Sequence, residues 1–265
     1  MTEKIKIFTI SDMPLSPSGV GTQTKYVIEG LLKTGKYKFV SLGGAIKHQQ
    51  YQPIKTEEWG DDWVIYPVDG FGNPDIIRSV IRNEKPALLW FMTDPRFYEW
   101  LWNMEDEIRP LLPMVYYHVW DNYPYPTFNR KFYLSNDYIA TISKVTDDFV
   151  KTVAPEVDRK YVPHAVDSTV FRRLSDEELS FYKKKHLGPD DKKVTFFWNN
   201  RNARRKMSGS LVWWFKEFLD QVGHDKARLI MHTDPKDHNG PDLEAHLQEF
   251  GLINGEIMFS KNKVT

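Results

Sequence analysis

The chain has 265 residues, of which 41% are hydrophobic and 27% are charged. Such a composition supports a buried core and excludes a chain that stays disordered. The 36 basic residues balance the 36 acidic residues, so electrostatic binding of nucleic acid is not expected to be the main activity. The absence of cysteine excludes disulfides, a thiolate nucleophile and cysteine ligands for zinc.

The sequence also lacks the patterns of secreted and membrane-spanning proteins. The apolar run in the opening MTEKIKIFTISD is too short for the hydrophobic part of a secretory leader. No stretch approaches the roughly 18 apolar residues that a membrane span requires. We therefore expect a soluble protein of the cytoplasm, a reducing compartment that suits a chain without cysteine.

Short apolar runs alternate with amphipathic segments over the first 166 residues. The runs expected to form strands are 4–12, 37–42, 63–68, 87–93, 113–119, 138–143 and 160–166. The segments expected to form helices are 22–33, 74–83, 95–109 and 145–153. Because most of these strands are almost continuously apolar, the pattern predicts an α/β fold with a parallel sheet covered on both faces.

A charged stretch with few apolar residues follows, and we expect the domain boundary within 167–173. This divides the chain into an amino-terminal domain, 1–168, and a carboxyl-terminal domain, 169–265. Beyond the boundary, helices are expected at 176–185, 208–222 and 242–250, and strands at 194–198, 228–232 and 256–259. The second domain is thus predicted to contain a β-α-β-α-β series, which is half of a doubly wound sheet.

A glycine-containing loop joins the first expected strand to the first expected helix. Gly19, Val20 and Gly21 allow a ligand to approach the backbone, and the helix start offers amide groups to a phosphate. Asp12 ends the preceding strand and belongs to the same candidate site. The dinucleotide fingerprint needs a further glycine where Thr24 stands, so NAD binding is disfavoured. A simple turn between strand and helix is the alternative.

His118 lies at the carboxyl end of an expected strand, where open α/β sheets bind their ligands. It could contact a sugar hydroxyl or accept a proton near neutral pH, or it could be a buried histidine bonded to the backbone. The aromatic residues that follow it could line a sugar-binding platform, but packing in the core or a loop is the expected role. These residues are Trp120, Tyr123, Tyr125 and Phe128.

A basic segment, Asn200 to Lys206, follows the first strand of the second domain. Arg201 and Lys206 could converge on a diphosphate, because guanidinium and ammonium groups bind such anions well. A solvated basic turn is the alternative. His232, Asp234, Asp237 and His238 are spaced without helical convergence, so no metal site is expected.

Four segments together resemble the retaining glycosyltransferases of family four. SPSGVGTQTKYVIEGL resembles the glycine loop and helix of that family, and TISKVTDDFV resembles one of its strand-to-helix segments. VPHAVDSTVF is similar to the signature between its domains, with Ala165 where glycine is usual. WNNRNARRK resembles its Gly-Arg-x4-Lys-Gly segment, with Asn200 in place of the first glycine.

The resemblance implies two Rossmann-like domains facing a cleft, the arrangement called GT-B. It implies transfer of a hexose from a UDP-, GDP- or ADP-sugar to a glycan, lipid or small-molecule acceptor, with retention of configuration and without a metal cofactor. Arg201 and Lys206 then occupy the paired basic positions that stabilise the diphosphate. His118 occupies the position of a histidine that faces the donor sugar. Gly19 and Gly21 come near the diphosphate or the transferred sugar.

The Glu-x7-Glu motif that this family carries near its carboxyl terminus has no counterpart before Thr265. We therefore expect an incomplete second domain, for which a partner chain could supply the other half. Nucleic acid is not an expected partner, and peripheral membrane contact stays open. The alternatives are a non-catalytic nucleotide-sugar or glycan-binding remnant, a split subunit, and a phosphate- or nucleotide-binding sensor domain.

Overall fold

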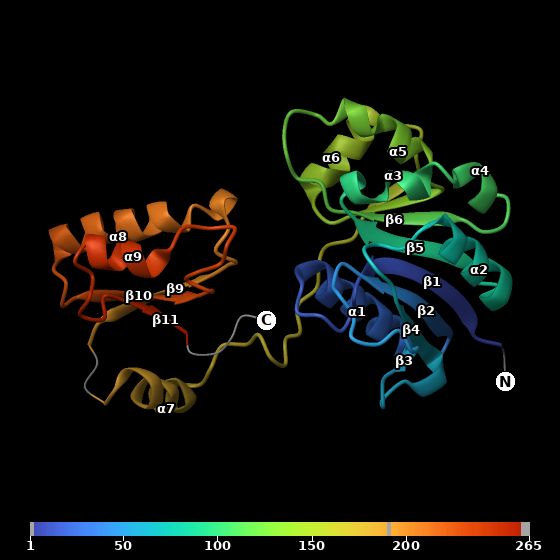
Figure 1. The fold of residues 1–265 in the computed structure, drawn as a ribbon. Coiled ribbons are helices and arrows are strands. Elements are labelled where there is room, and N and C mark those ends of the chain that lie inside the picture. Colours follow the sequence, from blue (N-terminus) through green and yellow to red (C-terminus); the bar gives the residue numbers. More distant parts are fainter. Residues whose placement is uncertain (1–2, 190–191, 261–265) are drawn as a thin grey trace. The chain divides into compact units, whose positions relative to one another are not determined.

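The computed structural model of the protein describes residues 3–189 and 192–260, and it divides into two compact units (Figure 1). The first unit is Met1–Ser168 and the second is Thr169–Thr265. Each unit has an α/β architecture built on a sheet with parallel strands. The predicted α/β class is therefore confirmed. The family resemblance also implies that the first unit lies on the acceptor side and the second on the donor side, and these roles stay predictions.

The first unit contains an eight-stranded sheet in the order β3-β4-β2-β1-β5-β6-β7-β8. Every neighbouring pair is parallel except β3 and β4, which are antiparallel. The strands are β1 (Ile5–Asp12), β2 (Tyr37–Gly44), β3 (Ile54–Lys55), β4 (Trp63–Pro67), β5 (Leu88–Thr93), β6 (Met114–His118), β7 (Tyr138–Thr141) and β8 (Arg159–Tyr161).

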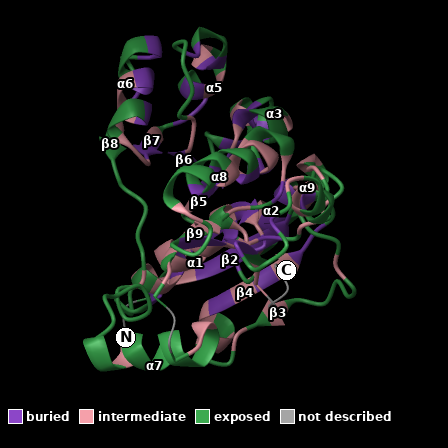
Figure 2. Cartoon of the chain, turned by 90° about the vertical axis from the view of Figure 1, so that its left-hand side faces the viewer, coloured by how far each residue is buried: buried purple, intermediate pink, exposed green. Residues whose placement is uncertain are grey.

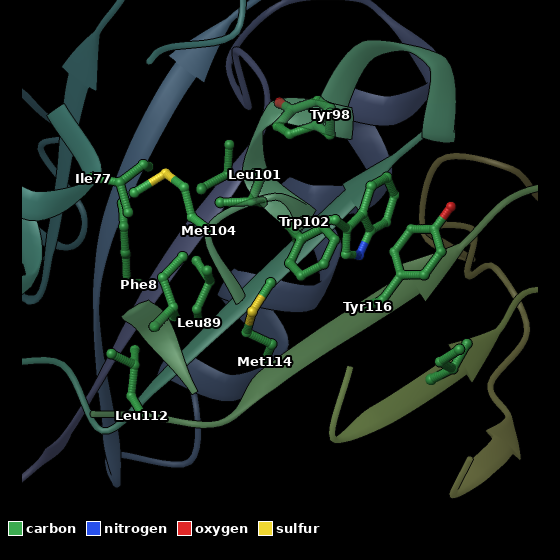
Figure 3. Close-up of a cluster of buried hydrophobic side chains, with 14 of the residues drawn as sticks. Phe8, Ile77, Leu89, Tyr98, Leu101, Trp102, Met104, Leu112, Met114 and Tyr116 are labelled. Atoms are coloured by element: carbon green, nitrogen blue, oxygen red, sulfur yellow. The ribbon is translucent and has the colours of Figure 1, made fainter. Parts of the chain in front are cut away.

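Helices cover both faces of this sheet and enclose two separate hydrophobic cores. One core packs the sheet against α1, and the other packs it against the helices α2 to α6. Figure 3 shows the second core. In this core the ring of Phe91 stacks 5.2 Å from that of Tyr116. The helices are α1 (Gly19–Leu32), α2 (Pro74–Glu84), α3 (Pro95–Trp102), α4 (Glu105–Ile108), α5 (Arg130–Leu134) and α6 (Lys144–Val153).

Three elements differ most clearly from their sequence-based bounds, and β3 and α5 have no counterpart among the expected elements. Helix α1 begins at Gly19, three residues early, because the Ser18 side chain caps it by accepting a hydrogen bond from the amide of Gly21. The helix expected over 95–109 is divided into α3 and α4, with non-helical backbone at Tyr98 (φ −124°). Strand β8 is only three residues long.

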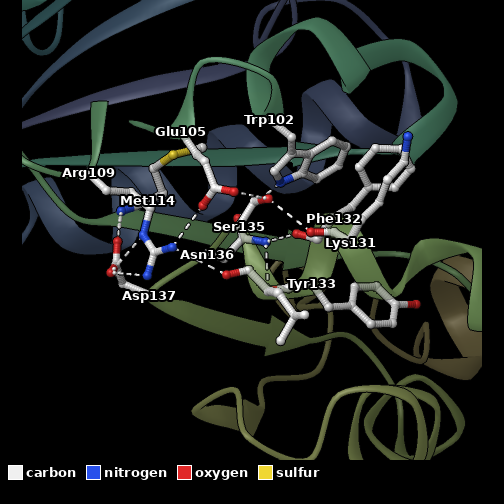
Figure 4. A network of polar contacts seen from close by, with 11 residues as sticks. Trp102, Glu105, Arg109, Met114, Lys131, Phe132, Tyr133, Ser135, Asn136 and Asp137 are labelled. Atoms are coloured by element: carbon white, nitrogen blue, oxygen red, sulfur yellow. Dashed lines mark hydrogen bonds and ion pairs between the residues drawn. The ribbon is translucent and has the colours of Figure 1, made fainter. Parts of the chain in front are cut away.

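A polar network joins the amino ends of β6 and β7 to α4 (Figure 4). The Arg109 guanidinium donates to Glu105 at 2.8 Å and to Asp137 at 3.1 Å. The second oxygen of Asp137 accepts a hydrogen bond from the amide of Met114 at 2.8 Å. The side-chain amide of Asn136 donates to the carbonyl of Tyr133, and its oxygen accepts from Trp102. These contacts fix α5, which carries Tyr133, against the sheet.

The described part of the second unit follows the predicted β-α-β-α-β order. Its parallel sheet has the order β11-β10-β9, and its core packs α8 and α9 on one face of that sheet. Helix α7 has a capping box from Ser175 and Glu178 but no buried residue, as Figure 2 shows. The elements are α7 (Asp176–Leu187), β9 (Val194–Asn199), α8 (Ser208–Val222), β10 (Ala227–His232), α9 (Leu243–Glu249) and β11 (Ile257–Phe259).

Candidate functional site

The strand register brings polar residues to one edge of the first sheet. Asp12 pairs with Gly44, and His118 pairs with both Thr93 and Thr141. These residues end β1, β2, β5, β6 and β7, so they mark the carboxyl edge of the sheet. This is the edge where wound α/β sheets bind ligands.

The glycine loop lies at this edge, and its two glycines have different roles. A Cβ atom on Gly21 would lie 2.5 Å from the Met13 carbonyl oxygen, so this glycine is required for the close packing of the loop. A Cβ atom on Gly19 would meet nothing within 4 Å, so the space over this residue is open. The open part of the loop is therefore at Gly19, in the first turn of α1.

Asp12 ends β1 at the carboxyl edge, and its charge acts on the buried Tyr98 hydroxyl of α3. Asp12 accepts a hydrogen bond from the Ser18 hydroxyl at 2.8 Å. Burial raises the pKa of Asp12, although the bond from Ser18 opposes this shift. The Tyr98 hydroxyl is buried and has no hydrogen-bond partner among the described residues. Burial, with a contribution from the Asp12 charge, holds the pKa of Tyr98 well above its usual range. The Tyr98 hydroxyl can therefore donate a hydrogen bond to a further group, and the Asp12 carboxylate can accept one.

His118 ends β6 as expected, but its side chain is 0% exposed. Its Nδ1 atom lies 2.8 Å from the Tyr116 hydroxyl and its Nε2 atom lies 2.7 Å from the Tyr133 hydroxyl. Tyr116 donates its own proton to the Thr93 carbonyl. The network therefore places the imidazole proton on Nδ1, so that Nε2 accepts a hydrogen bond from Tyr133.

The expectation of an accessible His118 imidazole is wrong for this structure, because both ring nitrogens are bonded inside the core. The alternative of a buried histidine holds, with tyrosine hydroxyls rather than backbone groups as its partners. Burial lowers the pKa of His118 to about 3, while the nearby Asp94 charge opposes the shift. The ring is neutral near pH 7.

The segment that leaves β8 is bound to α1 by a side chain that the sequence did not single out. Gln23 donates to the Ala165 carbonyl at 2.7 Å and accepts from the Ala165 amide at 3.0 Å. The Tyr117 hydroxyl donates to the Val162 carbonyl at 2.9 Å. His164, in the same segment, is exposed and its ring centroid lies 5.7 Å from that of Tyr117. The glycine loop and residues 162–165 therefore lie in the same part of the first unit.

In the second unit, Arg201 is anchored rather than free. Its guanidinium makes a two-pronged contact with Asp237, at 2.5 Å and 3.2 Å. The Arg201 hydrogen bond holds the pKa of Asp237 well below its usual range. The Asp237 side chain is 10% exposed, but that of Arg201 is 61% exposed. A ligand anion could therefore reach the guanidinium, although Asp237 competes for it.

Lys206 lies within a short 3-10 helix, Arg204–Lys206, and is half-buried. Two backbone hydrogen bonds of 2.8 Å fold the segment: Ala203 donates to the Arg201 carbonyl, and Lys206 donates to the Ala203 carbonyl. The carbonyl of Arg201 and the amide of Lys206 are thus both bonded to Ala203. Convergence of the two cationic groups on one anion stays a prediction.

Asn202 holds the basic segment in place, and the sequence analysis overlooked it. It is 0% exposed, its amide donates to the carbonyls of Pro235 and Pro241, and its oxygen accepts from Ser208. A Cβ atom on Gly240 would lie 2.3 Å from this oxygen, so the two loops pack in direct contact. A single asparagine between Arg201 and Ala203 gives no periodic signal. Asp237 could have been suspected only as one of the scattered acidic residues.

Neither a metal cluster nor a membrane span is found among the described residues 3–189 and 192–260. No group of three or more histidine, aspartate or glutamate side chains there could hold a metal ion. No helix in these ranges has the length and apolarity needed to cross a bilayer.

The fold is similar to those of solved glycosyltransferase structures. Anabaena HepE in complex with UDP and glucose matches with a TM-score of 0.65 and 13% identity, over 96% of this chain and 68% of that one. A glycosyltransferase from Rickettsia africae matches with a TM-score of 0.64 and 15% identity, over 99% and 69%. A trehalose 6-phosphate synthase from Burkholderia multivorans matches with a TM-score of 0.61 and 10% identity, over 99% and 74%.

The chain shares the fold of these glycosyltransferases. No known family profile matches its sequence, and no curated protein matches it. The similarity is thus one of fold rather than of sequence.

Proposed function

We propose that the protein transfers a hexose from a nucleotide diphosphate sugar to an acceptor, with retention of configuration. The observation that carries the proposal is the position of two candidate phosphate-binding elements, each directly after a strand, on a fold shared with glycosyltransferases. The open first turn of α1 follows β1 in the first unit. The segment with Arg201 and Lys206 follows β9 in the second unit. The family resemblance implies that both elements bind the same donor.

Arg201 and Lys206 would bind the diphosphate and stabilise the negative charge that it gains as it leaves. The bond between the anomeric carbon and the phosphate oxygen breaks, and its electron pair stays on the diphosphate. The acceptor oxygen bonds to the same face of the anomeric carbon, and its proton passes to the departing phosphate oxygen. Two fixed cations supply the positive charge that a bound metal ion supplies in other transferases. No metal cofactor is therefore part of the proposal.

Gly19, Val20, Gly21 and Asp12 would bind the donor from the first unit. The open space over Gly19 lets a sugar or phosphate oxygen approach the amides of the first turn, which include that of Val20. Gly21 keeps the loop in this conformation. Asp12 would accept a hydrogen bond from a sugar hydroxyl.

His118 enters the proposal as a positioning residue rather than a catalytic residue. Its neutral ring links Tyr133 to Tyr116, and Tyr116 in turn donates to the Thr93 carbonyl at the carboxyl edge. Asp94, the next residue, caps α3. The ring therefore holds the end of β5 in place without contacting the sugar.

We also propose that a further strand pairs with β9, supplied by the same polypeptide or by a partner chain. β9 lies at the edge of the described sheet, and three of its apolar side chains are exposed: Val194 at 61%, Phe196 at 44% and Phe197 at 66%. Parallel sheets are normally covered on both faces and protected at their edges.

The test is calorimetric titration of UDP, GDP and ADP into the wild type and four variants. Arg201→Ala and Lys206→Ala should each weaken binding by roughly 10- to 100-fold, since each removes a charge-assisted contact. Arg205→Ala is the matched control, because Arg205 is an exposed cation of the same segment outside the proposed pair. Asp237→Asn should strengthen binding, because it removes the competitor for Arg201.

Equal losses in all three alanine variants would replace the site with a diffuse basic patch, and no binding of any nucleotide would overturn the proposal. Binding without sugar transfer, measured by NMR of the products from UDP-, GDP- and ADP-glucose, would favour a non-catalytic nucleotide-sugar-binding protein instead.

A further inference from the structure

The segment 119–129, between β6 and α5, displays large aromatic side chains to solvent. Phe128 is 62% exposed, Tyr123 is 57% exposed and Tyr125 is 39% exposed. These three rings do not lie in the core, whereas the expected packing within the loop is confirmed by the contacts between Trp120 and Phe128 and between Tyr123 and Tyr125. Several exposed aromatic rings in one short segment usually mark a binding surface.

The tyrosines of this segment are held in place by α6. The Tyr125 hydroxyl donates to Asp148 at 2.7 Å. The rings of Tyr123 and Tyr125 both pack edge-on against Phe149, with centroid distances of 4.8 Å and 5.7 Å. Phe149 is itself 0% exposed.

Trp120 fixes the start of the segment. Its carbonyl accepts a hydrogen bond from the Thr146 hydroxyl at 2.9 Å, and its indole donates to the Asn122 carbonyl at 2.8 Å. Its ring packs edge-on against Phe128 at 5.6 Å. The aromatic surface is therefore preorganised, so a ligand would bind it at a low entropic cost.

The charges of the segment select the kind of ligand. Residues 119–129 contain Asp121 and no lysine or arginine. The two cations that follow are engaged by acidic partners: Arg130 by Glu156, and Lys131 by Glu99. Such a surface disfavours nucleic acid and anionic lipid, whose phosphates need free cations. A neutral ligand with an apolar face and many hydroxyl groups fits it better, because the hydroxyls can donate to the Asp121 carboxylate.

The segment begins one residue after His118, at the carboxyl edge of the first sheet. We propose that residues 119–129 bind a neutral carbohydrate, and that Tyr123 and Phe128 stack against its sugar rings. This inference rests on the proposed function, for which it names the acceptor as a glycan rather than a lipid or an anionic small molecule.

The test is calorimetric and NMR titration of three neutral oligosaccharides: maltohexaose, cellohexaose and chitohexaose. At least one should bind the wild type. Tyr123→Ala and Phe128→Ala should each weaken that binding by roughly 5- to 30-fold, as removal of an aromatic anchor does. Phe181→Ala is the matched control, because Phe181 is 60% exposed but lies in the second unit. Circular dichroism would verify that the variants keep their fold.

UDP binding, measured in parallel, separates the two proposals. Loss of oligosaccharide binding with unchanged UDP affinity supports the glycan surface. Oligosaccharide binding through this segment without any nucleotide binding keeps this inference but removes the transferase. The inference is overturned if no oligosaccharide binds, if both variants bind as the wild type does, or if phosphatidylserine vesicles bind while the oligosaccharides do not.

Discussion

Two apolar strands with similar sequences have opposite environments in the two units. In β5, LLWFMT, Phe91 is 0% exposed because helices cover both faces of the sheet and strands flank both edges. In β9, VTFFWN, Phe197 is 66% exposed, since the described core covers only the other face of that sheet. An apolar run thus predicts a strand, whereas burial depends on the neighbours that other segments supply.

The carboxyl edges of the two sheets differ as well. In the first unit, the edge carries an internal network of neutral groups around His118. In the second unit, it carries exposed cations held by an acidic partner, as in the pair of Arg201 and Asp237. The His118 network at the first edge is suited to positioning the end of β5, whereas Arg201 at the second edge is suited to binding an anion. Four predictions test this comparison.

The largest effect is expected from Phe91→Ala, which should lower the free energy of unfolding of the first unit by about 3–5 kcal/mol. The substitution leaves a cavity between stacked aromatic rings that cannot collapse easily. Scanning calorimetry measures the shift of the transition. Phe97→Ala is the control, since Phe97 is 50% exposed, and it should change stability far less. Similar losses of stability in both variants would show that burial in the core does not determine the cost of removing a phenylalanine ring.

Asn202→Ala should destabilise the second unit by about 3 kcal/mol, because it leaves buried carbonyl groups and a hydroxyl without their partner. Urea denaturation of the wild type and the variant measures the difference. Asn199→Ala is the control, because Asn199 is exposed and ends β9 just before the loop that carries Asn202. This variant should be about as stable as the wild type. An Asn202 variant as stable as the wild type would mean that the hydrogen bonds of Asn202 do not hold the basic segment in place.

His118 should make the first unit less stable in acid. Its pKa is about 3 in the folded chain, against an ordinary value of 6.5. Below about pH 6.5 the unfolded chain therefore takes up a proton that the folded chain refuses. Stability is fully present above that pH and falls as the pH drops toward 3. This one group should contribute about 2 kcal/mol of loss between pH 7 and pH 5.

The measurement is urea denaturation at both pH values for the wild type and His118→Gln. The variant should be less stable at pH 7, but its loss on acidification should be smaller by that amount. An identical pH dependence in both proteins would contradict a neutral, buried imidazole.

The smallest effect is expected from Phe197→Ser on the exposed strand β9. Because the ring is mostly in water, the free energy of unfolding should change by less than about 0.5 kcal/mol. Calorimetry measures this change, and light scattering should show less self-association. A large loss of stability would reveal that another segment or a partner covers this face.

The order of the longer strands and helices and the edge location of His118 could be predicted from the sequence, whereas β3, α5 and the division between α3 and α4 could not. Apolar runs, helical periodicity and the serine before the glycines are signals within short stretches of sequence. Because the strands are parallel, their carboxyl ends lie at the same edge of the sheet. The state of the His118 ring could not be predicted, because it depends on Tyr133. That residue lies on α5, a helix of five residues that is too short to give a periodic signal.

The same division applies to the candidate sites. The sequence by itself determined the α/β class, the glycine loop and the basic segment, because each depends on residues close together in the chain. Only the tertiary structure decided that Asn202 ties two loops together, that Asp237 binds Arg201, and that Tyr123 and Phe128 face solvent. These outcomes depend on contacts between segments far apart in the chain, and on which surfaces the folded units leave uncovered.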